Sequence, residues 1–169
     1  AEAPIELARH DGPVTVLHDV HVHGDKPVKS LTAPDVDTAR EQINRTPGGV
    51  DLVPAEAYED RYALTLKDSL RDTPGVFAQA RFGEEVRLSI RGSGLGRFTH
   101  LRGVLLLADG VPVSRADGFG DFQDLDPLAV RYVEVYKGGN GLRHGSASLG
   151  GAINLVSPTG RTAAQTGLV

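Results

Sequence analysis

The chain has 169 residues, enough for one domain with a hydrophobic core and additional terminal segments. Its formal net charge is −4 and it has no basic stripe, which argues against nucleic acid as a partner. Cysteine is absent, so disulfide frameworks and thiolate metal sites are excluded. No apolar run approaches the roughly 20 residues of a membrane-spanning helix.

The first 49 residues contain one extended phrase. Residues 14–22 read Val-Thr-Val-Leu-His-Asp-Val-His-Val, and their last part alternates valine with histidine, which predicts a strand with one apolar face. Residues 24–49 lose this pattern and contain three prolines and a Gly-Gly pair. We therefore interpret residues 24–49 as a flexible linker.

Folding signals resume at Val50–Val53, a short strand candidate that Pro54 would end. Thr65 is a good helix N-cap, and Asp68 stands three residues later as an acidic variant of the capping box. Pro74-Gly75 would stop this helix. The sequence thus predicts a short strand followed by a short helix.

The second half of the chain contains the clearest strand patterns. Val86–Ile90 alternates, which indicates one buried face, and Val104–Ala108 is apolar throughout, as in an inner strand. Asp109-Gly110 predicts a tight hairpin turn, and Asp126-Pro127 predicts the start of a short helix. Two more strands are expected at residues 132–136 and 152–156. The predicted fold class is α+β: a small mixed β-sheet of about four strands with short helices and long loops, preceded by a flexible N-terminal segment.

Motifs for catalysis are missing. The glycine cluster that begins at Gly92 does not match a dinucleotide fingerprint, because Arg97 occupies its third glycine position and no helix pattern follows. No serine lies in a nucleophile elbow, and no histidine is paired with a carboxylate in a recognisable arrangement. We therefore expect a protein that is not an enzyme and uses no cofactor.

Two clusters could in principle hold a metal ion. The imidazoles of His18, His21 and His23 are weak candidates for zinc or copper, but no fourth ligand stands at structural spacing, and a solvated polar tail is the simpler interpretation. Four aspartates at residues 117–126 do not have the spacing of a calcium loop. We predict no metal site, and keep a soluble periplasmic domain that binds metal through these histidines as the alternative function.

Six phrases occur in order at close spacing: Thr73-Pro-Gly-Val, Ile90-Arg-Gly, Asp109-Gly-Val-Pro-Val, Val133-Glu-Val-Tyr-Lys-Gly, His144-Gly-Ser-Ala-Ser and Leu149-Gly-Gly-Ala-Ile-Asn-Leu-Val. As a set they resemble the plug (cork) domain of TonB-dependent outer-membrane receptors of Gram-negative bacteria, and most of all the branch that takes up ferric siderophores. The resemblance covers about residues 50–158. It implies that residues 1–49 are a periplasmic segment, that 50–158 form the plug inside a barrel, and that 159–169 begin a transmembrane β-barrel that this chain lacks.

The resemblance also implies a partner for the extended N-terminal phrase. The phrase Leu-His-Asp-Val-His-Val-His-Gly-Asp, at residues 17–25, resembles a TonB box, and the TonB-box-like stretch is expected at residues 14–24. Such a segment would add a strand to the C-terminal domain of TonB by β-augmentation. Histidines stand where the family often has threonine, valine or glutamine. The implied TonB-binding residues are Leu17, His18, Asp19, Val20, His21 and Val22.

The family pattern carries over to two further groups of residues. Arg91 and Lys137 match basic positions that pair with glutamates of the barrel wall, with Lys137 in place of a frequent arginine. The external loops of a plug meet the substrate, and arginines there suit an anionic iron chelate. The implied substrate-binding residues are Arg81, Phe82, Gly96, Arg97, Phe98, Phe119, Asp121 and Phe122. The implied function is to gate the barrel, contact an iron-chelate-type substrate and couple to TonB.

Overall fold

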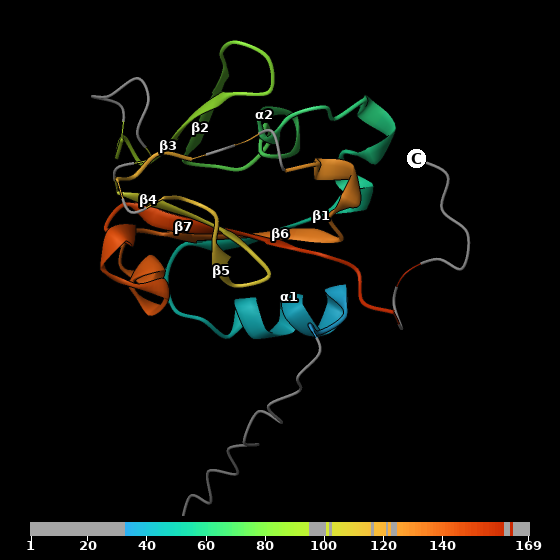
Figure 1. Ribbon diagram of the computed structural model, residues 1–169. Coiled ribbons are helices and arrows are strands. Elements are labelled where there is room, and N and C mark those ends of the chain that lie inside the picture. Colours follow the sequence, from blue (N-terminus) through green and yellow to red (C-terminus); the bar gives the residue numbers. More distant parts are fainter. Residues whose placement is uncertain are drawn as a thin grey trace, which may run out of the picture.

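The strand signals of the sequence form one mixed five-stranded β-sheet in the computed structural model (Figure 1). The structure describes residues 33–160 except 95–100, 102, 116, 121, 123 and 124, and also residue 163. Neighbouring strands are antiparallel except β4 and β7, which are parallel. The expected α+β fold is confirmed, with five strands in this sheet instead of about four. In spatial order they are β1 (Val50–Pro54), β6 (Tyr132–Lys137), β7 (Gly151–Val156), β4 (Val104–Ala108) and β5 (Val111–Pro112).

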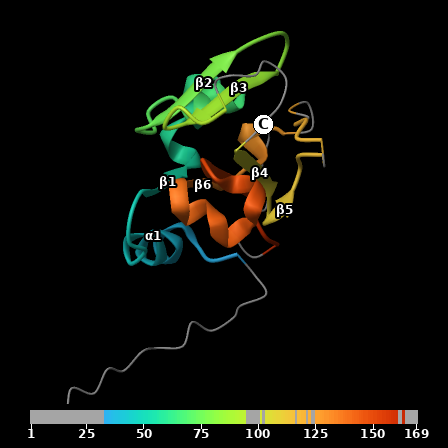
Figure 2. The same ribbon diagram turned by 90° about the vertical axis from the view of Figure 1, so that its left-hand side faces the viewer.

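A second sheet contains only the antiparallel strands β2 (Val76–Ala80) and β3 (Val86–Ile90). It lies on one side of the main sheet (Figures 1 and 2). The alternating apolar residues of β3 are buried, as their pattern predicted. They pack in the main hydrophobic cluster but do not extend the five-stranded sheet.

The main sheet separates two packed regions, and β6 shows how. Val133 and Val135 belong to the cluster that also contains β3 and helix α2 (Leu66–Ser69). Tyr132 has the opposite parity on the strand and packs with Ala39 on the other side of the sheet. The larger core therefore lies between the two sheets.

A nine-residue helix, α1 (Val36–Asn44), covers the other face of the main sheet (Figure 1). The Asp35 carboxylate accepts a 2.8 Å hydrogen bond from the backbone N–H of Thr38 and so caps the helix. Ala39 and Ile43, four residues apart, are both buried. We expected a flexible linker over residues 24–49. That expectation is wrong for the described part of the range, because a capped helix with a narrow apolar face forms there.

Several short-range predictions are confirmed. The N–H of Thr65 donates to Asp68 Oδ2 at 3.1 Å, the bond expected of the acidic residue in the capping box of α2, and the Thr65 hydroxyl donates to the same oxygen at 3.0 Å. Asp109 and Gly110 both have positive φ, 50° and 79°, and turn the chain from β4 into β5. Asp126 caps a single 3-10 turn, with Leu128 N–H donating at 2.9 Å.

The remaining helical segments are short 3-10 turns: η1 (Ala55–Ala57), η2 (Glu59–Arg61), η3 (Pro127–Ala129), η4 (Gly138–His144) and η5 (Ser146–Ser148). Across the described ranges, no helix has the length and apolar character needed to cross a membrane.

Candidate functional site

The two basic residues expected at the barrel wall come together near the start of β1. Arg91 follows β3 with a positive φ of 52°, and its guanidinium lies over Gly49, where an added Cβ would collide with it. The same guanidinium reaches Gly138, whose added Cβ would lie 3.4 Å from Nη1. Gly138 directly follows Lys137. The fold thus places Arg91 and Lys137 at one rim of the core between the sheets.

Lys137 and Arg91 differ in their counter-charges. The Nζ of Lys137 forms an ion pair with the Asp51 carboxylate of β1, and only 8% of the lysine side chain is exposed. Burial of an ammonium group requires such a partner, because an isolated charge in the core loses its hydration. Arg91 is exposed, and no described carboxylate lies within 4 Å of its guanidinium. Arg91 is therefore the cation of this pair that faces outward.

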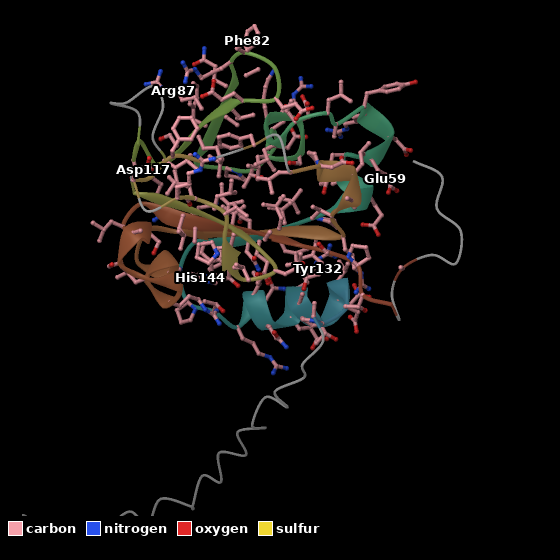
Figure 3. The ribbon with its side chains drawn as sticks, viewed as in Figure 1. Glu59, Phe82, Arg87, Asp117, Tyr132 and His144 are labelled. Atoms are coloured by element: carbon pink, nitrogen blue, oxygen red, sulfur yellow. The ribbon has the colours of Figure 1, made fainter. Side chains whose placement is uncertain are left out.

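Two of the expected substrate-contact residues, Arg81 and Phe82, lie at the tip of the β2–β3 hairpin. Phe82 is 92% exposed and projects from the end of the hairpin (Figure 3). Arg81 donates to Glu85 at 3.1 Å, and the backbone closes the same turn through a 2.8 Å bond from Arg81 N–H to the Glu85 carbonyl. The hairpin therefore presents a free aromatic ring beside an arginine that already has a carboxylate partner.

The two phenylalanines of the next loop differ in their surroundings. Phe119 is half-buried, and its backbone N–H donates to Asp117 Oδ1 at 2.9 Å. Phe122 is only 6% exposed and belongs to the main hydrophobic cluster. The expectation that Phe122 contacts a ligand is thus replaced by a core role, because its ring fills space beside Leu101 and Gly120.

Several predicted site residues lie outside the described part of the chain. They are Leu17, His18, Asp19, Val20, His21, Val22, His23, Gly96, Arg97, Phe98 and Asp121. The TonB-binding and histidine metal predictions therefore stay predictions. Within the described residues, no group of three histidine or acidic side chains is placed to hold a metal ion.

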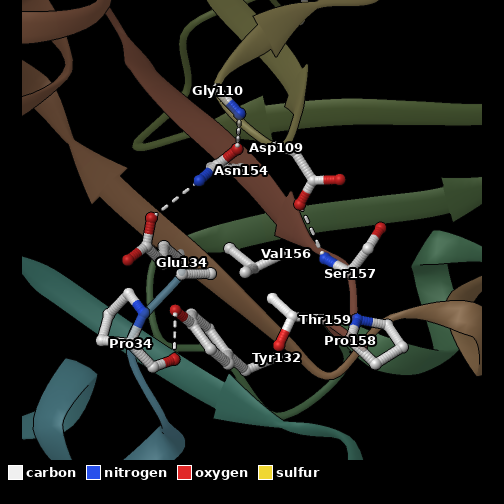
Figure 4. Close-up of a pocket in the computed structure, with 11 residues that line it drawn as sticks. Pro34, Asp109, Gly110, Tyr132, Glu134, Asn154, Val156, Ser157, Pro158 and Thr159 are labelled. Carbon is white, nitrogen blue, oxygen red and sulfur yellow. Dashed lines mark hydrogen bonds between the residues drawn. The ribbon is translucent and has the colours of Figure 1, made fainter. Parts of the chain in front are cut away.

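Sequence reasoning missed a polar cavity on the α1 side of the main sheet (Figure 4). Its volume is about 490 Å3. Asn154 crosses it: its amide donates to Glu134 at 2.8 Å and accepts a 2.9 Å bond from the Gly110 N–H. Asn154 is 8% exposed, so these bonds fix a buried amide beside the partly buried Glu134 on this face of the sheet. The sequence signal for this site was Glu134, an acidic residue that alternates with Tyr132 and Tyr136 on the same face of β6.

Burial controls the ionisation of the tyrosines and the histidine around these strands. Burial raises the pKa of Tyr132 to about 12, and the nearby Glu134 carboxylate acts in the same direction. Tyr136 has its pKa raised for the same two reasons. The ring of His144 lies 4.7 Å from that of Tyr136, and burial lowers the pKa of His144. These groups are neutral near pH 7, which suits packing more than proton transfer.

Residues 42–152 match the family model of the TonB-dependent Receptor Plug Domain. The chain belongs to this plug-domain family. The resemblance seen in the sequence is thereby confirmed for a region that holds Arg91, Lys137 and the tip of the β2–β3 hairpin.

Relatives of this plug domain include iron receptors. The Ferric enterobactin receptor PirA of Pseudomonas aeruginosa is 29% identical over 143 residues, which cover 73% of this chain and 18% of the relative. The Iron-regulated outer membrane virulence protein of Vibrio cholerae is 33% identical over 123 residues, covering 68% and 18%. The plug domain thus spans about a fifth of the length of these relatives. The first of these relatives is named as a receptor for ferric enterobactin, and the second as an outer membrane protein.

Solved structures show the same fold. The siderophore receptor PirA from Acinetobacter baumannii is 25% identical with a TM-score of 0.55, covering 72% of this chain and 18% of that one. The ferric citrate transporter FecA in its unliganded form is 24% identical with a TM-score of 0.61, covering 77% and 21%. At this identity the second likeness concerns the plug fold alone.

Proposed function

We propose that this plug domain gates the lumen of an outer-membrane barrel and meets an iron chelate at its β2–β3 end. The observation that supports the proposal is that the β2–β3 hairpin and helix α1 lie on opposite sides of the main sheet (Figure 1). Phe82 projects from the hairpin on one side of the main sheet, whereas α1, which follows the N-terminal segment, covers the other side (Figures 1 and 3). A ligand signal and a pulling partner can therefore act on different faces of one small sheet.

The names of the relatives and the side chains of the proposed contact loops both support an iron chelate as the substrate. Two relatives are named as receptors for ferric enterobactin. Phe82 offers apolar contact, and Arg97 and Phe98 add a cation and a ring in the predicted loop. We assign ligand contact to Arg81, Phe82, Gly96, Arg97, Phe98, Phe119 and Asp121, and leave Phe122 to the core.

Coupling to TonB is the second part of the proposal. Residues 17–22 would pair as an extended strand with the TonB C-terminal domain, since their valines alternate with polar residues. Arg91 would pair with a carboxylate of the barrel wall, because it faces outward without a described partner of its own. Together these contacts hold the plug in place until the N-terminal segment is pulled.

The test of coupling is binding of the TonB C-terminal domain to the 169-residue chain. Val20→Pro or Val22→Pro removes a backbone N–H from the strand and is expected to abolish binding, whereas Val28→Pro, outside the segment, leaves it unchanged. Equal binding by all three variants would refute the assignment. The test of substrate contact is uptake of ferric enterobactin and ferric citrate by the complete receptor, where Phe82→Ala should reduce uptake of the true substrate.

A further inference from the structure

A groove between α2 and β2 carries two cations that the family assignment does not use. Its volume is about 450 Å3, and it lies beside the lower part of the β2–β3 hairpin, away from the tip. Lys67 and Arg71 line it together with Phe77, and its apolar wall consists of Leu70, Val76 and Ala78.

The two cations have no described carboxylate within ion-pair distance. Lys67 lies in α2, Arg71 lies two residues beyond its end, and both residues are exposed. The one acidic residue that lines the groove, Asp68, already accepts from the N–H and hydroxyl of Thr65 at 3.1 and 3.0 Å. The groove lining thus carries two cations and one carboxylate, a net charge of +1, on a chain whose net charge is −4.

An aromatic surface stands beside these charges. Phe77 is 47% exposed, although its neighbours Val76 and Ala78 pack against the main core. A half-exposed ring next to two cations fits a ligand that has both a planar ring and a negative charge. A ligand with either property alone would satisfy only part of the groove.

We propose that this groove binds an aromatic carboxylate. In the receptor it would be a second binding site, below the hairpin tip, for an anionic chelate that contains aromatic rings. The role in uptake rests on the proposed function, whereas the binding itself does not. Lys67 and Arg71 receive the carboxylate, and the ligand ring lies on the exposed part of the Phe77 ring. Because both cations are exposed and salt screens them, the affinity is expected to be about millimolar for a single ring.

The experiment uses three small probes with the 169-residue chain and follows backbone amide signals by NMR. Benzoate has the ring and the charge, acetate only the charge, and benzyl alcohol only the ring. We expect benzoate to shift amides of residues 67–78 and to bind at least several-fold more tightly than either fragment. Absence of these shifts, or equal binding of acetate and benzoate, would overturn the inference.

Variants localise the site. Lys67→Gln and Arg71→Gln are each expected to weaken benzoate binding about two- to fivefold, and Phe77→Ala about three- to tenfold. Arg45→Gln, which removes an exposed charge from α1, is the matched control and should change nothing. An equal effect of the control would show general charge attraction and reject the site.

The double variant Arg81→Gln/Phe82→Ala separates this inference from the proposed function. It alters the hairpin tip and is expected to leave benzoate binding in the groove unchanged. Shifts confined to residues 81–85 of the unaltered chain would reject the groove while supporting ligand contact at the tip.

Discussion

Lys137 and Asp51 form an ion pair between β6 and the edge strand β1, at the rim of the main core. The lysine side chain is 8% exposed and the aspartate side chain 34%. A charge this buried depends on its partner, because little water remains to replace it. The edge strand is therefore held by a side-chain charge as well as by its backbone ladder.

Replacement of Asp51 by asparagine should expose this dependence. We expect Asp51→Asn to lower the free energy of unfolding by about 1–3 kcal/mol, because a buried ammonium group loses its counter-charge. Urea denaturation at pH 7 measures the change. Adding Lys137→Met to Asp51→Asn should recover part of the loss, since the unpaired charge is then removed.

The exposed pair of Arg61 and Asp72 is the matched control. Its two atoms are 2.7 Å apart, but the side chains are 60% and 73% exposed. Asp72→Asn should therefore cost at most about 0.5 kcal/mol. If Asp72→Asn and Asp51→Asn cost the same, burial of Lys137 does not decide the energy of its pair.

Phe82 and Phe122 should respond oppositely to truncation. Phe122→Ala is expected to destabilise the domain by about 3–5 kcal/mol, because a buried ring leaves a cavity. Phe82→Ala should change stability by less than about 0.5 kcal/mol, because the ring is already in water. Thermal or urea unfolding of both variants measures this contrast, and similar losses would contradict the assigned core and tip roles.

These two rings also show the limit of what the sequence predicts. Both are phenylalanines in polar, glycine-containing loops, so their local sequences resemble each other. Their exposures differ because distant residues, such as those of the β3 and β6 core, close over one and not the other. Local pattern alone does not contain that information.

Predictions that depended on short-range physics were accurate. The Thr65–Asp68 capping box and the Asp109-Gly110 turn involve neighbours within three residues, so their sequence determines their geometry. Helix α1 was missed because its buried face consists of only Ala39 and Ile43, too narrow a stripe to stand out among prolines and glycines. The ion pair of Asp51 was missed because its partner lies on a strand far along the chain.

Gly141 and Gly139 of η4 provide a test of backbone packing. A Cβ on Gly141 would lie 2.8 Å from the Ser148 carbonyl oxygen and 2.9 Å from Gly151, both backbone groups that cannot rotate away. We expect Gly141→Ala to cost about 2–4 kcal/mol of unfolding free energy. Gly139 has nothing within 4 Å of an added Cβ, so Gly139→Ala should be neutral or slightly stabilising. Equal effects in urea denaturation would contradict the tight crossing at Gly141.

The Asp35 cap should make the stability of α1 depend on pH. The backbone N–H of Thr38 donates to Asp35 and lowers the pKa of that carboxyl below 3.8. Because the folded pKa is the lower one, the stabilisation is present above about pH 3.8 and is lost as the pH falls through the folded value. NMR titration of Asp35 with amide exchange at Ala39 should show α1 loosening only below that range. Asp35→Asn keeps a capping oxygen and should remove the pH dependence; persistence of that dependence would assign it to another group.

Replacement of Asn154 by aspartate should make the stability of the domain depend on pH through the polar cavity. Its side-chain nitrogen donates to Glu134 at 2.8 Å, so Asn154→Asp replaces a donor by a second carboxylate (Figure 4). Two carboxylates at this distance cannot both ionise cheaply, and the folded pKa of the pair rises above the unfolded value. We expect a loss of about 2–3 kcal/mol at pH 7.5 that shrinks as the pH falls toward 5, because protonation restores a donor. Urea denaturation at both pH values measures it, with Asn44→Asp on the exposed end of α1 as the control. A loss that is independent of pH would mean that Asn154 acts through its shape and not through its hydrogen bond to Glu134.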